Sequence, residues 1–403
     1  MERVADTPPS RAVTLAVLGL ASMTIMANAT VASSLPGLRA HFADVPHIDT
    51  LAGLIVTLPS LAIVLSAGVM GVLIDRWDRQ KLLLITAVLY CIGGTSGLWA
   101  DSLTGILIGR LALGLGVAGT MNLGMTWGLD LWQGAERARF LGMQGAAISA
   151  AGIVFMLMGG LFASYHWRGA FAVYAMILPI AALAWVVLAP HARRIAAERD
   201  RPKPARSTAD QFPWAAYAFI APLAFLFQVA FYVTPTRLPF HLEALGVQSP
   251  LVVGALMAAL VMVSAPVSLM YGRIRARVSA MTIFGLSFVL IGAGFLAHAM
   301  ATDWHGVLVG SLIAGLGMGI SMPNYTTWFM ERVPATMRGR ASGLLTTAFF
   351  LGQFASPLVS APLVATFGLA GTFAAVGAGL ITLGVGLWAL HALRPDPRAA
   401  EAQ

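Results

Sequence analysis

The chain has 403 residues, of which 58% are hydrophobic and 10% are charged, and its mean hydropathy is +0.80. A soluble protein has a largely polar surface, so this composition excludes a soluble globular protein and favours a membrane protein. The formal net charge is +8, but the arginines form short clusters between apolar runs. They make no basic stripe interleaved with aromatic residues, so we expect no nucleic-acid partner.

Apolar runs follow one another along the chain, each about 20 residues long and able to cross a hydrocarbon core of roughly 30 Å as a helix. They predict twelve spans, at residues 13–38, 50–72, 82–100, 103–127, 140–163, 169–189, 215–240, 250–271, 280–300, 305–328, 341–364 and 370–391. No small-residue cleavage site follows the first run, so we interpret it as a retained span and not as a signal peptide. The single cysteine, Cys91, lies in an apolar run. It can form neither an intramolecular disulfide nor a cysteine metal site, and we expect no metal and no cofactor.

The basic residues indicate how the chain is oriented. Of the 25 Lys and Arg residues, 21 fall on the side that carries both termini. The opposite side holds Arg39, Arg168 and Arg237, and Arg110 lies inside the fourth predicted span. The positive-inside rule then predicts a multi-pass protein of the bacterial inner membrane with both termini in the cytoplasm.

A polar stretch rich in Arg and Pro, residues 190–213, separates the sixth predicted span from the seventh. It predicts a cytoplasmic linker between an N-terminal six-helix bundle at 1–189 and a C-terminal six-helix bundle at 214–403. An amphipathic surface helix over part of this stretch is the alternative.

An internal repeat relates the two halves. A shift of 201 positions places residues 114–142 over 315–343 with nine identities and no gap, and Trp127 then matches Trp328. Because the shift spans six helices, an even number, both halves have the same orientation in the membrane. We therefore predict an all-α membrane protein built of two pseudo-symmetric six-helix bundles.

Three motifs carry a family resemblance. The loop after the second span, GVLIDRWDRQK at 71–81, resembles the signature loop G-x-x-x-D-R-x-G-R-[RK] of the major facilitator superfamily, with Asp78 in place of the usual glycine. RLALGLG at 110–116 and WRGAF at 167–171 are similar to further motifs of that family. The resemblance covers the whole chain. It implies the major facilitator fold, with twelve helices in two bundles, and transport of a small-molecule substrate by alternating access.

Charged residues gather at the predicted cytoplasmic ends of the second and fourth spans, where charges need partners. Our hypothesis is that the acids here pair with the arginines and form a latch on the cytoplasmic face of the bundle. The candidate latch residues are Gly71, Asp75, Arg76, Arg79, Lys81 and Asp130. The alternative is charge that only sets the topology.

Arg110 is the one ionised residue deep in a predicted span. Either it lines the substrate cavity or serves coupling, or it holds helices together through backbone carbonyls. Other polar residues within spans are candidates for the cavity wall or, equally, for hydrogen bonds between helices. These are Asn28, Asn122, Gln144, Gln228, Tyr232, Asn324, Tyr325 and Gln353. The seventeen Asp and Glu residues fall in loops or at helix ends, so the buried acid of many proton-coupled drug exporters has no counterpart in the first span.

The chain contains no H-E-x-x-H motif, nucleophile elbow or Walker A loop, so we expect neither an enzyme nor an ATP-driven pump. The overall pattern resembles bacterial drug and metabolite exporters. This implies proton-coupled efflux of small apolar or amphipathic compounds by a monomer surrounded by membrane lipids. Transport of an organic anion or other metabolite with the help of Arg110, and a membrane receptor or scaffold, are the alternatives. Six histidines map to the outer face, and we interpret them as ordinary interfacial residues: His41, His47, His166, His241, His298 and His305.

Overall fold

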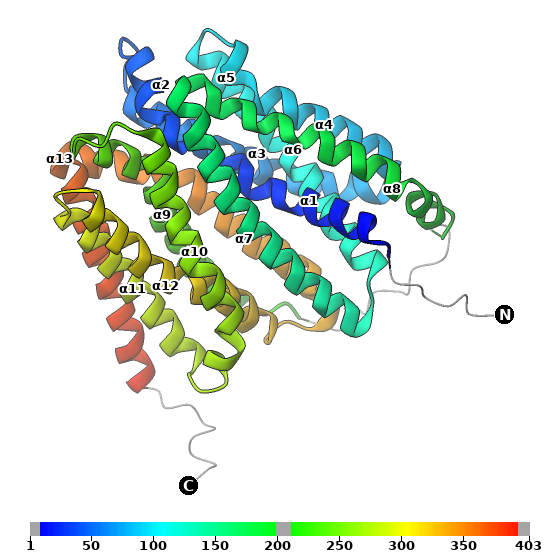
Figure 1. The fold of residues 1–403 in the computed structure, drawn as a ribbon. Coiled ribbons are helices and arrows are strands. Elements are labelled where there is room, and N and C mark those ends of the chain that lie inside the picture. The colour runs from blue at the N-terminus through cyan, green and yellow to red at the C-terminus, as the bar shows by residue number, and fades with distance from the viewer. Residues whose placement is uncertain (1–8, 199–210, 394–403) are drawn as a thin grey trace. The chain divides into compact units, whose positions relative to one another are not determined.

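The computed structural model describes residues 9–198 and 211–393. Every regular element in these ranges is a helix, which confirms the predicted all-α class (Figure 1). The chain divides into two compact units, Met1–Arg206 and Ser207–Gln403.

The first unit contains long helices joined by short connections. In chain order its elements are α1 (Arg11–Ala29), the 3₁₀ helix η1 (Ala32–Ser34), α2 (Leu35–His41), α3 (Ile48–Arg76), α4 (Arg79–Gly94), α5 (Ser96–Trp99), α6 (Leu103–Leu131), α7 (Gly134–Tyr165), the 3₁₀ helix η2 (Trp167–Met176) and α8 (Ile177–Glu198). Within this unit α6 packs against α1, α3 and α4, and α1 also contacts α7 and α8.

The second unit is built in the same way. Its elements are α9 (Trp214–Ala244), α10 (Pro250–Arg275), α11 (Ala280–Met300), α12 (Trp304–Met330), the 3₁₀ helix η3 (Ala335–Met337) and α13 (Arg338–Leu393). Helix α11 packs against α12 and α13, α12 also contacts α10, and α13 also contacts α9.

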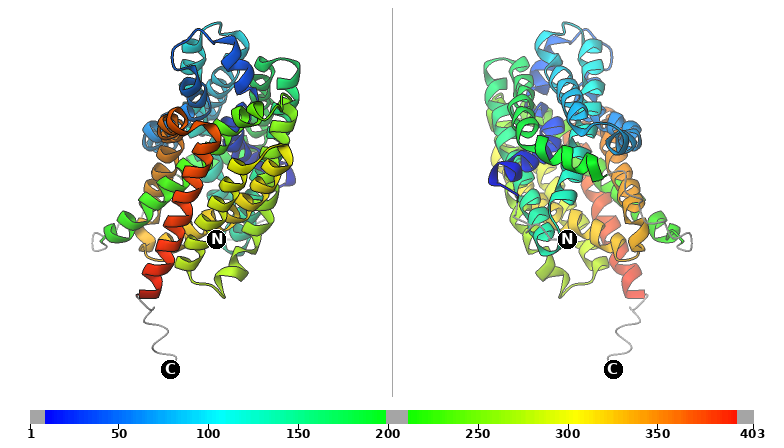
Figure 2. Two further views of the ribbon diagram at one scale, coloured as in Figure 1. Left: turned by 90° about the vertical axis from the view of Figure 1, so that its left-hand side faces the viewer. Right: turned by 90° about the vertical axis from the view of Figure 1, so that its right-hand side faces the viewer.

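Ten helices in the described ranges are long and apolar enough to cross a membrane. One of them, the 56-residue α13, contains two predicted spans, because its backbone turns at Gly368 with φ 70° and ψ −176°. Only glycine adopts such angles readily, and Figure 2 shows the two parts of α13 running in different directions. The predicted span 82–100 is divided into α4, of 16 residues, and α5, with a break at Thr95. Once α13 is counted as two spans and the divided α4–α5 segment is added, all twelve predicted spans are helical in the structure.

The sixth span differs from the prediction at both ends. It begins as η2 and continues as α8 through Pro190 to Glu198. Residues 190–198, predicted as linker, are therefore helical, as in the alternative interpretation. Residues 199–210 of the predicted linker lie outside the described ranges.

The internal repeat is present in the packing as well as in the sequence. A Cβ added at Gly116 would lie 2.5 Å from a backbone nitrogen of α4, and one added at Gly317 would lie 2.7 Å from a backbone oxygen of α11. The residues approached are Thr86 and Tyr90 in the first unit and Ser287 and Ile291 in the second, again 201 positions apart. Each unit therefore uses an equivalent glycine, Gly116 or Gly317, to bring an equivalent pair of helices into backbone contact.

Candidate functional site

Within the predicted latch, Arg79 and Asp130 form an ion pair. An Nη1 atom of Arg79, the first residue of α4, lies 2.6 Å from Oδ2 of Asp130 near the end of α6. The Arg79 side chain is only 9% exposed, whereas that of Asp130 is 37% exposed. The pair joins α4 to α6 at the end of the unit that the sequence predicts to be cytoplasmic.

The other predicted latch residues have different surroundings. Asp75, Arg76 and Lys81 are exposed, and a Cβ at Gly71 would meet nothing within 4 Å. Asp78, the residue that departs from the family motif, caps α4: its carboxylate accepts hydrogen bonds from two backbone N–H groups, at 2.7 and 3.2 Å. An aspartate at this position stabilises the helix start, which gives the departure a physical reason.

A weaker version of the latch occurs in the second unit. Glu331, the repeat counterpart of Asp130, lies 3.7 Å from Nη2 of Arg275, and both side chains are about a third exposed or more. Ala276 stands at the position that corresponds to Asp75. Both units therefore carry an acid–arginine pair at this end, but the residues and the distance differ.

Arg110 is fully buried inside the first unit. Its guanidinium carbon lies 4.6 Å from the centre of the Phe171 ring and 4.8 Å from that of Tyr174, both in η2. None of its three side-chain nitrogens forms a well-aligned hydrogen bond with a described residue, but the Tyr174 hydroxyl is close enough to interact with the guanidinium. The nearby Tyr174 and Tyr90 hydroxyls donate to backbone carbonyls of α1, at 3.1 and 2.7 Å. Two aromatic faces thus stabilise the cation, and its N–H groups form no well-aligned hydrogen bond in the described part of the chain.

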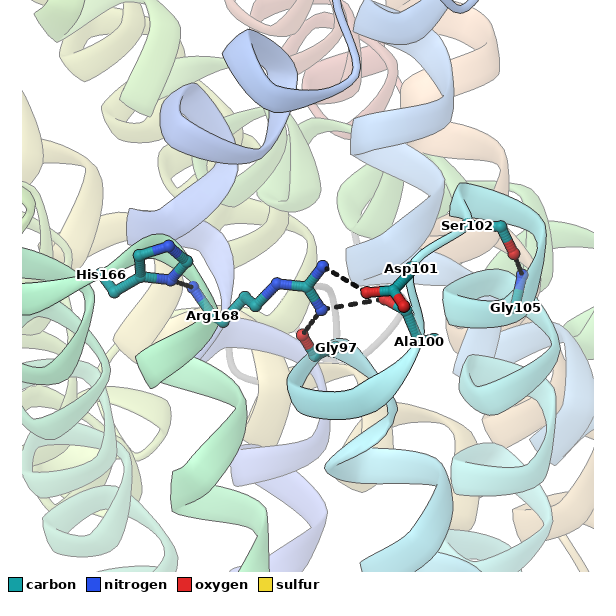
Figure 3. Close-up of polar contacts among 7 residues, drawn as sticks. All are labelled: Gly97, Ala100, Asp101, Ser102, Gly105, His166 and Arg168. Atoms are coloured by element: carbon teal, nitrogen blue, oxygen red, sulfur yellow. Dashed lines mark hydrogen bonds and ion pairs between the residues drawn. The ribbon is translucent and has the colours of Figure 1, made fainter.

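Arg168, in the first turn of η2, contacts the connection between α5 and α6, as Figure 3 shows. Its Nη1 donates to the carbonyls of Gly97 and Ala100, both at 2.9 Å, and its Nη2 lies 3.3 Å from Oδ1 of Asp101. The distribution of basic residues placed Arg168 on the outer side, and the family motif at 167–171 contains it, but neither gave it a partner. The structure shows that it joins the α5–α6 connection to the start of η2.

The predicted cavity residues of the first unit differ in burial and in hydrogen bonding. Asn122 is half-buried and donates to the Ala118 carbonyl of its own helix at 2.8 Å. Gln144 in α7 is half-buried. Asn28 lies in α1, but its side chain is outside the described part.

In the second unit, two of the predicted cavity residues hold helices together. Asn324 accepts a hydrogen bond from the Tyr271 hydroxyl at 3.0 Å and donates to the Ala280 carbonyl at 3.0 Å. The Tyr325 hydroxyl donates to the Leu223 carbonyl at 3.1 Å. Both residues act as interhelical contacts, which is the alternative that the sequence left open.

The remaining cavity candidates, Gln228, Tyr232 and Gln353, are buried on α9 and α13. The Nε2 atom of Gln353 has no hydrogen-bond partner among the described residues. These two helices pack against each other, so Gln353 places an unused amide donor within the second unit.

Sequence reasoning missed a buried polar cluster in the second unit. Arg237, expected on the outer side, lies inside α9 and is 1% exposed. Its Nε donates to Ser360 and its Nη2 to the Pro357 carbonyl, both at 2.9 Å. His241 and His298 are buried as well, so the interfacial interpretation is wrong for these two. Arg237 lies within the predicted span 215–240, three residues before its end. This position inside an apolar run is the signal that could have indicated its burial.

Comparisons with known proteins agree with this architecture. Over 368 residues the chain is 25% identical to the class C tetracycline resistance protein of Escherichia coli, covering 86% of this chain and 88% of the other. It is 23% identical over 336 residues to the sialic acid transporter NanX of Escherichia coli (strain K12), covering 81% of each chain. It is 24% identical over 360 residues to the 3-(3-hydroxy-phenyl)propionate transporter of the same strain, covering 83% of each.

Solved structures show the same fold. A crystal structure of a D-xylose-proton symporter superposes with a TM-score of 0.75 at 18% identity, covering 94% of this chain and 97% of the other. A crystal structure of the peptide transporter POT superposes with a TM-score of 0.76 at 13% identity, covering 97% of both. The sequence profile of the Major Facilitator Superfamily matches residues 17–357 and 249–403. The chain therefore belongs to the Major Facilitator Superfamily and is a multi-pass membrane transporter of the secondary active type.

Proposed function

We propose that the protein exports small apolar or amphipathic compounds in exchange for protons, by alternating access. The observation that carries this proposal is the surroundings of Arg110: a permanent positive charge, fully buried, enclosed by two aromatic rings and without a well-aligned hydrogen bond to a described residue. A second positive charge 5 Å away would be disfavoured by about 3 kcal/mol at an effective dielectric constant of 20. The buried charge therefore raises the cost of placing either a proton or a cationic substrate nearby, and exchange requires that the two are not bound together.

The similarity to a tetracycline resistance protein supports the export direction and an apolar or amphipathic substrate. The Arg79–Asp130 pair supports alternating access, because a charged contact at one end of a bundle can favour one state of the cycle by a few kcal/mol. We propose that this end is cytoplasmic and that the protein acts as a monomer in a bacterial inner membrane.

Flux in proteoliposomes tests the proposal. Purified protein is reconstituted with the pH dye pyranine inside, a pH gradient is imposed, and tetracycline or ethidium is added as the probe. We expect either probe to accelerate proton movement, and Arg110→Ala to abolish that acceleration per folded molecule. Arg110→Lys should also fail, because lysine lacks the planar fork and loses its proton more readily when desolvated. The exposed Arg139 provides the control Arg139→Ala. Normal coupling in Arg110→Ala would contradict the role of Arg110.

Transport of an organic anion is the second candidate. Arg110 has unused hydrogen-bonding capacity, and a guanidinium suits a carboxylate because it can donate two parallel hydrogen bonds. Two relatives are named for the transport of sialic acid and of 3-(3-hydroxy-phenyl)propionate. Flux of these two acids that Arg110→Ala abolishes, with no response to tetracycline or ethidium, would favour this candidate over the first.

Cysteine labelling in membranes tests the orientation. A cysteine in place of His47, in the Cys91→Ser background, should react with an impermeant maleimide from outside intact cells. A reporter fused near Arg201 should be active in the cytoplasm. The reverse result at either position would contradict both cytoplasmic termini.

A further inference from the structure

The buried polar cluster of the second unit, which contains His241 and His298, has no part in the proposed role of Arg110 or of the Arg79–Asp130 pair. His241 lies in α9, His298 in α11 and Ser311 in α12, and each is at most 3% exposed. Arg237 lies one helical turn before His241 on α9. Phe373 of α13 covers both imidazoles, with ring centres 5.3 Å from each.

The hydrogen bonds leave one ring nitrogen unused. Nε2 of His241 lies 2.8 Å from the backbone oxygen of His298. Because a carbonyl only accepts, this nitrogen carries the hydrogen. Nε2 of His298 lies 3.2 Å from the Ser311 hydroxyl. Nδ1 of His298 is buried and has no partner among the described residues, so the ring has an unoccupied position at which its protonation can change.

The repeat connects this group with Arg110. At a shift of 201 positions, His298 corresponds to Gly97 and Ser311 to Arg110. In the first unit Gly97 contacts the ring of Phe171 and leaves room for Arg110 to extend over that ring. In the second unit the large and small residues are exchanged, since His298 lies beside an aromatic ring and Ser311 contacts it. Both units thus place a nitrogen-bearing group against an aromatic ring at equivalent positions of the fold.

The two groups differ in how they titrate. A guanidinium stays charged at every physiological pH, whereas an imidazole changes its charge between about pH 5 and 8. We propose that His298, supported by His241, is a proton-binding site of the C-terminal bundle, with Nδ1 of His298 as the atom that takes up and releases the proton. The role of this site in the transport cycle rests on the proposed proton exchange, but its titration does not.

Charged and titratable groups on the surrounding helices define the setting of His298. Helix α9 contributes Arg237, His241 and Glu243, and the start of α12 contributes Asp303 and His305. The titratable groups of the described part of α13 are Arg338, Arg340 and His391. His391 contacts Ser279, at the opposite end of α11 from His298. The positive charge of Arg237 and the lack of an acid hydrogen-bonded to His298 in the described part favour weak, reversible binding of the proton.

Histidine-selective NMR tests the proposal on the full-length protein. ¹³C/¹⁵N-histidine-labelled protein in nanodiscs is titrated from about pH 3.5 to 8, because burial disfavours the charged imidazole, and the His298 signals are assigned by their loss in His298→Gln. The expected result is that His298 changes protonation state within this range and that His241→Gln raises its midpoint by about 0.5 pH unit, since a charged His241 disfavours a second positive charge beside it. His305→Gln, at the exposed start of α12, is the matched control and should leave the midpoint unchanged. If His298→Gln does not fold, Ser311→Ala provides the assignment, because it changes the partner of Nε2.

The outcomes separate this site from the proposed function. A His298 that stays in one protonation state from about pH 3.5 to 8 would overturn the proton-binding site, whatever the flux assays show. A His298 that titrates as expected, in a protein that moves no protons with tetracycline or ethidium, would support the site and count against proton exchange with those compounds. A midpoint that responds equally to His241→Gln and His305→Gln would overturn the supporting role of His241.

Discussion

The Arg79–Asp130 pair allows a quantitative prediction, because its two side chains differ in exposure. Exposed ion pairs contribute about 0–1 kcal/mol, whereas removal of one partner from a buried pair costs about 3–5 kcal/mol. Arg79 is 9% exposed and Asp130 is 37% exposed, so solvent screens the acid but not the arginine. We therefore expect an interaction energy of about 1–3 kcal/mol, which changes an equilibrium about 5- to 150-fold.

A double-mutant cycle measures this energy. Unfolding of purified protein in mixed micelles is compared for Asp130→Asn, Arg79→Gln and the double variant. Asp130→Asn should be the more harmful single change, since it leaves a buried guanidinium without its carboxylate. The double variant should be more stable than the sum of the single losses predicts. Glu136→Gln, which removes an exposed acid from the first turn of α7, is the charge-matched control and should have little effect.

Two results would refute the reasoning. Additive losses, with a coupling energy below about 0.5 kcal/mol, would show that the two residues do not interact energetically. A coupling energy of the expected size, together with wild-type flux in all three variants, would show that the pair stabilises the first unit but has no role in transport.

Two further predictions concern the contact of Gly116 with α4 and the N-cap of α12. Gly116→Val should lower the melting temperature strongly, because its Cβ would meet backbone atoms of α4 that cannot move away. Gly145→Val is the control and should be tolerated, since a Cβ there would meet nothing within 4 Å. Equal melting temperatures of the two variants would contradict the close packing. The backbone N–H of Gly306 and the imidazole of His305 lower the pKa of Asp303, the N-cap of α12. Because the folded-state pKa lies below the unfolded one, the stabilisation is present at neutral pH and is lost as the pH falls below about 4. Asp303→Asn should therefore melt earlier than wild type at pH 7, with a difference that shrinks in acid, and a difference independent of pH would argue against this contribution.

Several features of the candidate site were predictable, and several were not. Asp130 and Arg79 were candidates because charges at the ends of apolar helices need partners, but the sequence offered two acids and several basic residues without a way to pair them. The structure pairs Arg79 with Asp130, and the two residues are 51 positions apart. Arg110 was evident as a charge within a span. That it lies between two rings of η2 could not be inferred, because η2 is about 60 positions away and forms a 3₁₀ helix.

The sequence by itself determined the class of the protein. Hydropathy, the distribution of arginines and the 201-residue repeat are properties of the order of residues along the chain, and they led to the spans and the two halves. The family came from the resemblance of the motifs at 71–81, 110–116 and 167–171. Tertiary structure alone decided the surroundings of the polar residues. Arg237, His241 and His298 are buried because helices distant in sequence pack around them. Hydropathy averaged over a window describes how a segment partitions into lipid, but burial of a single side chain depends on which neighbours surround it, and only the packing of the helices supplies those neighbours.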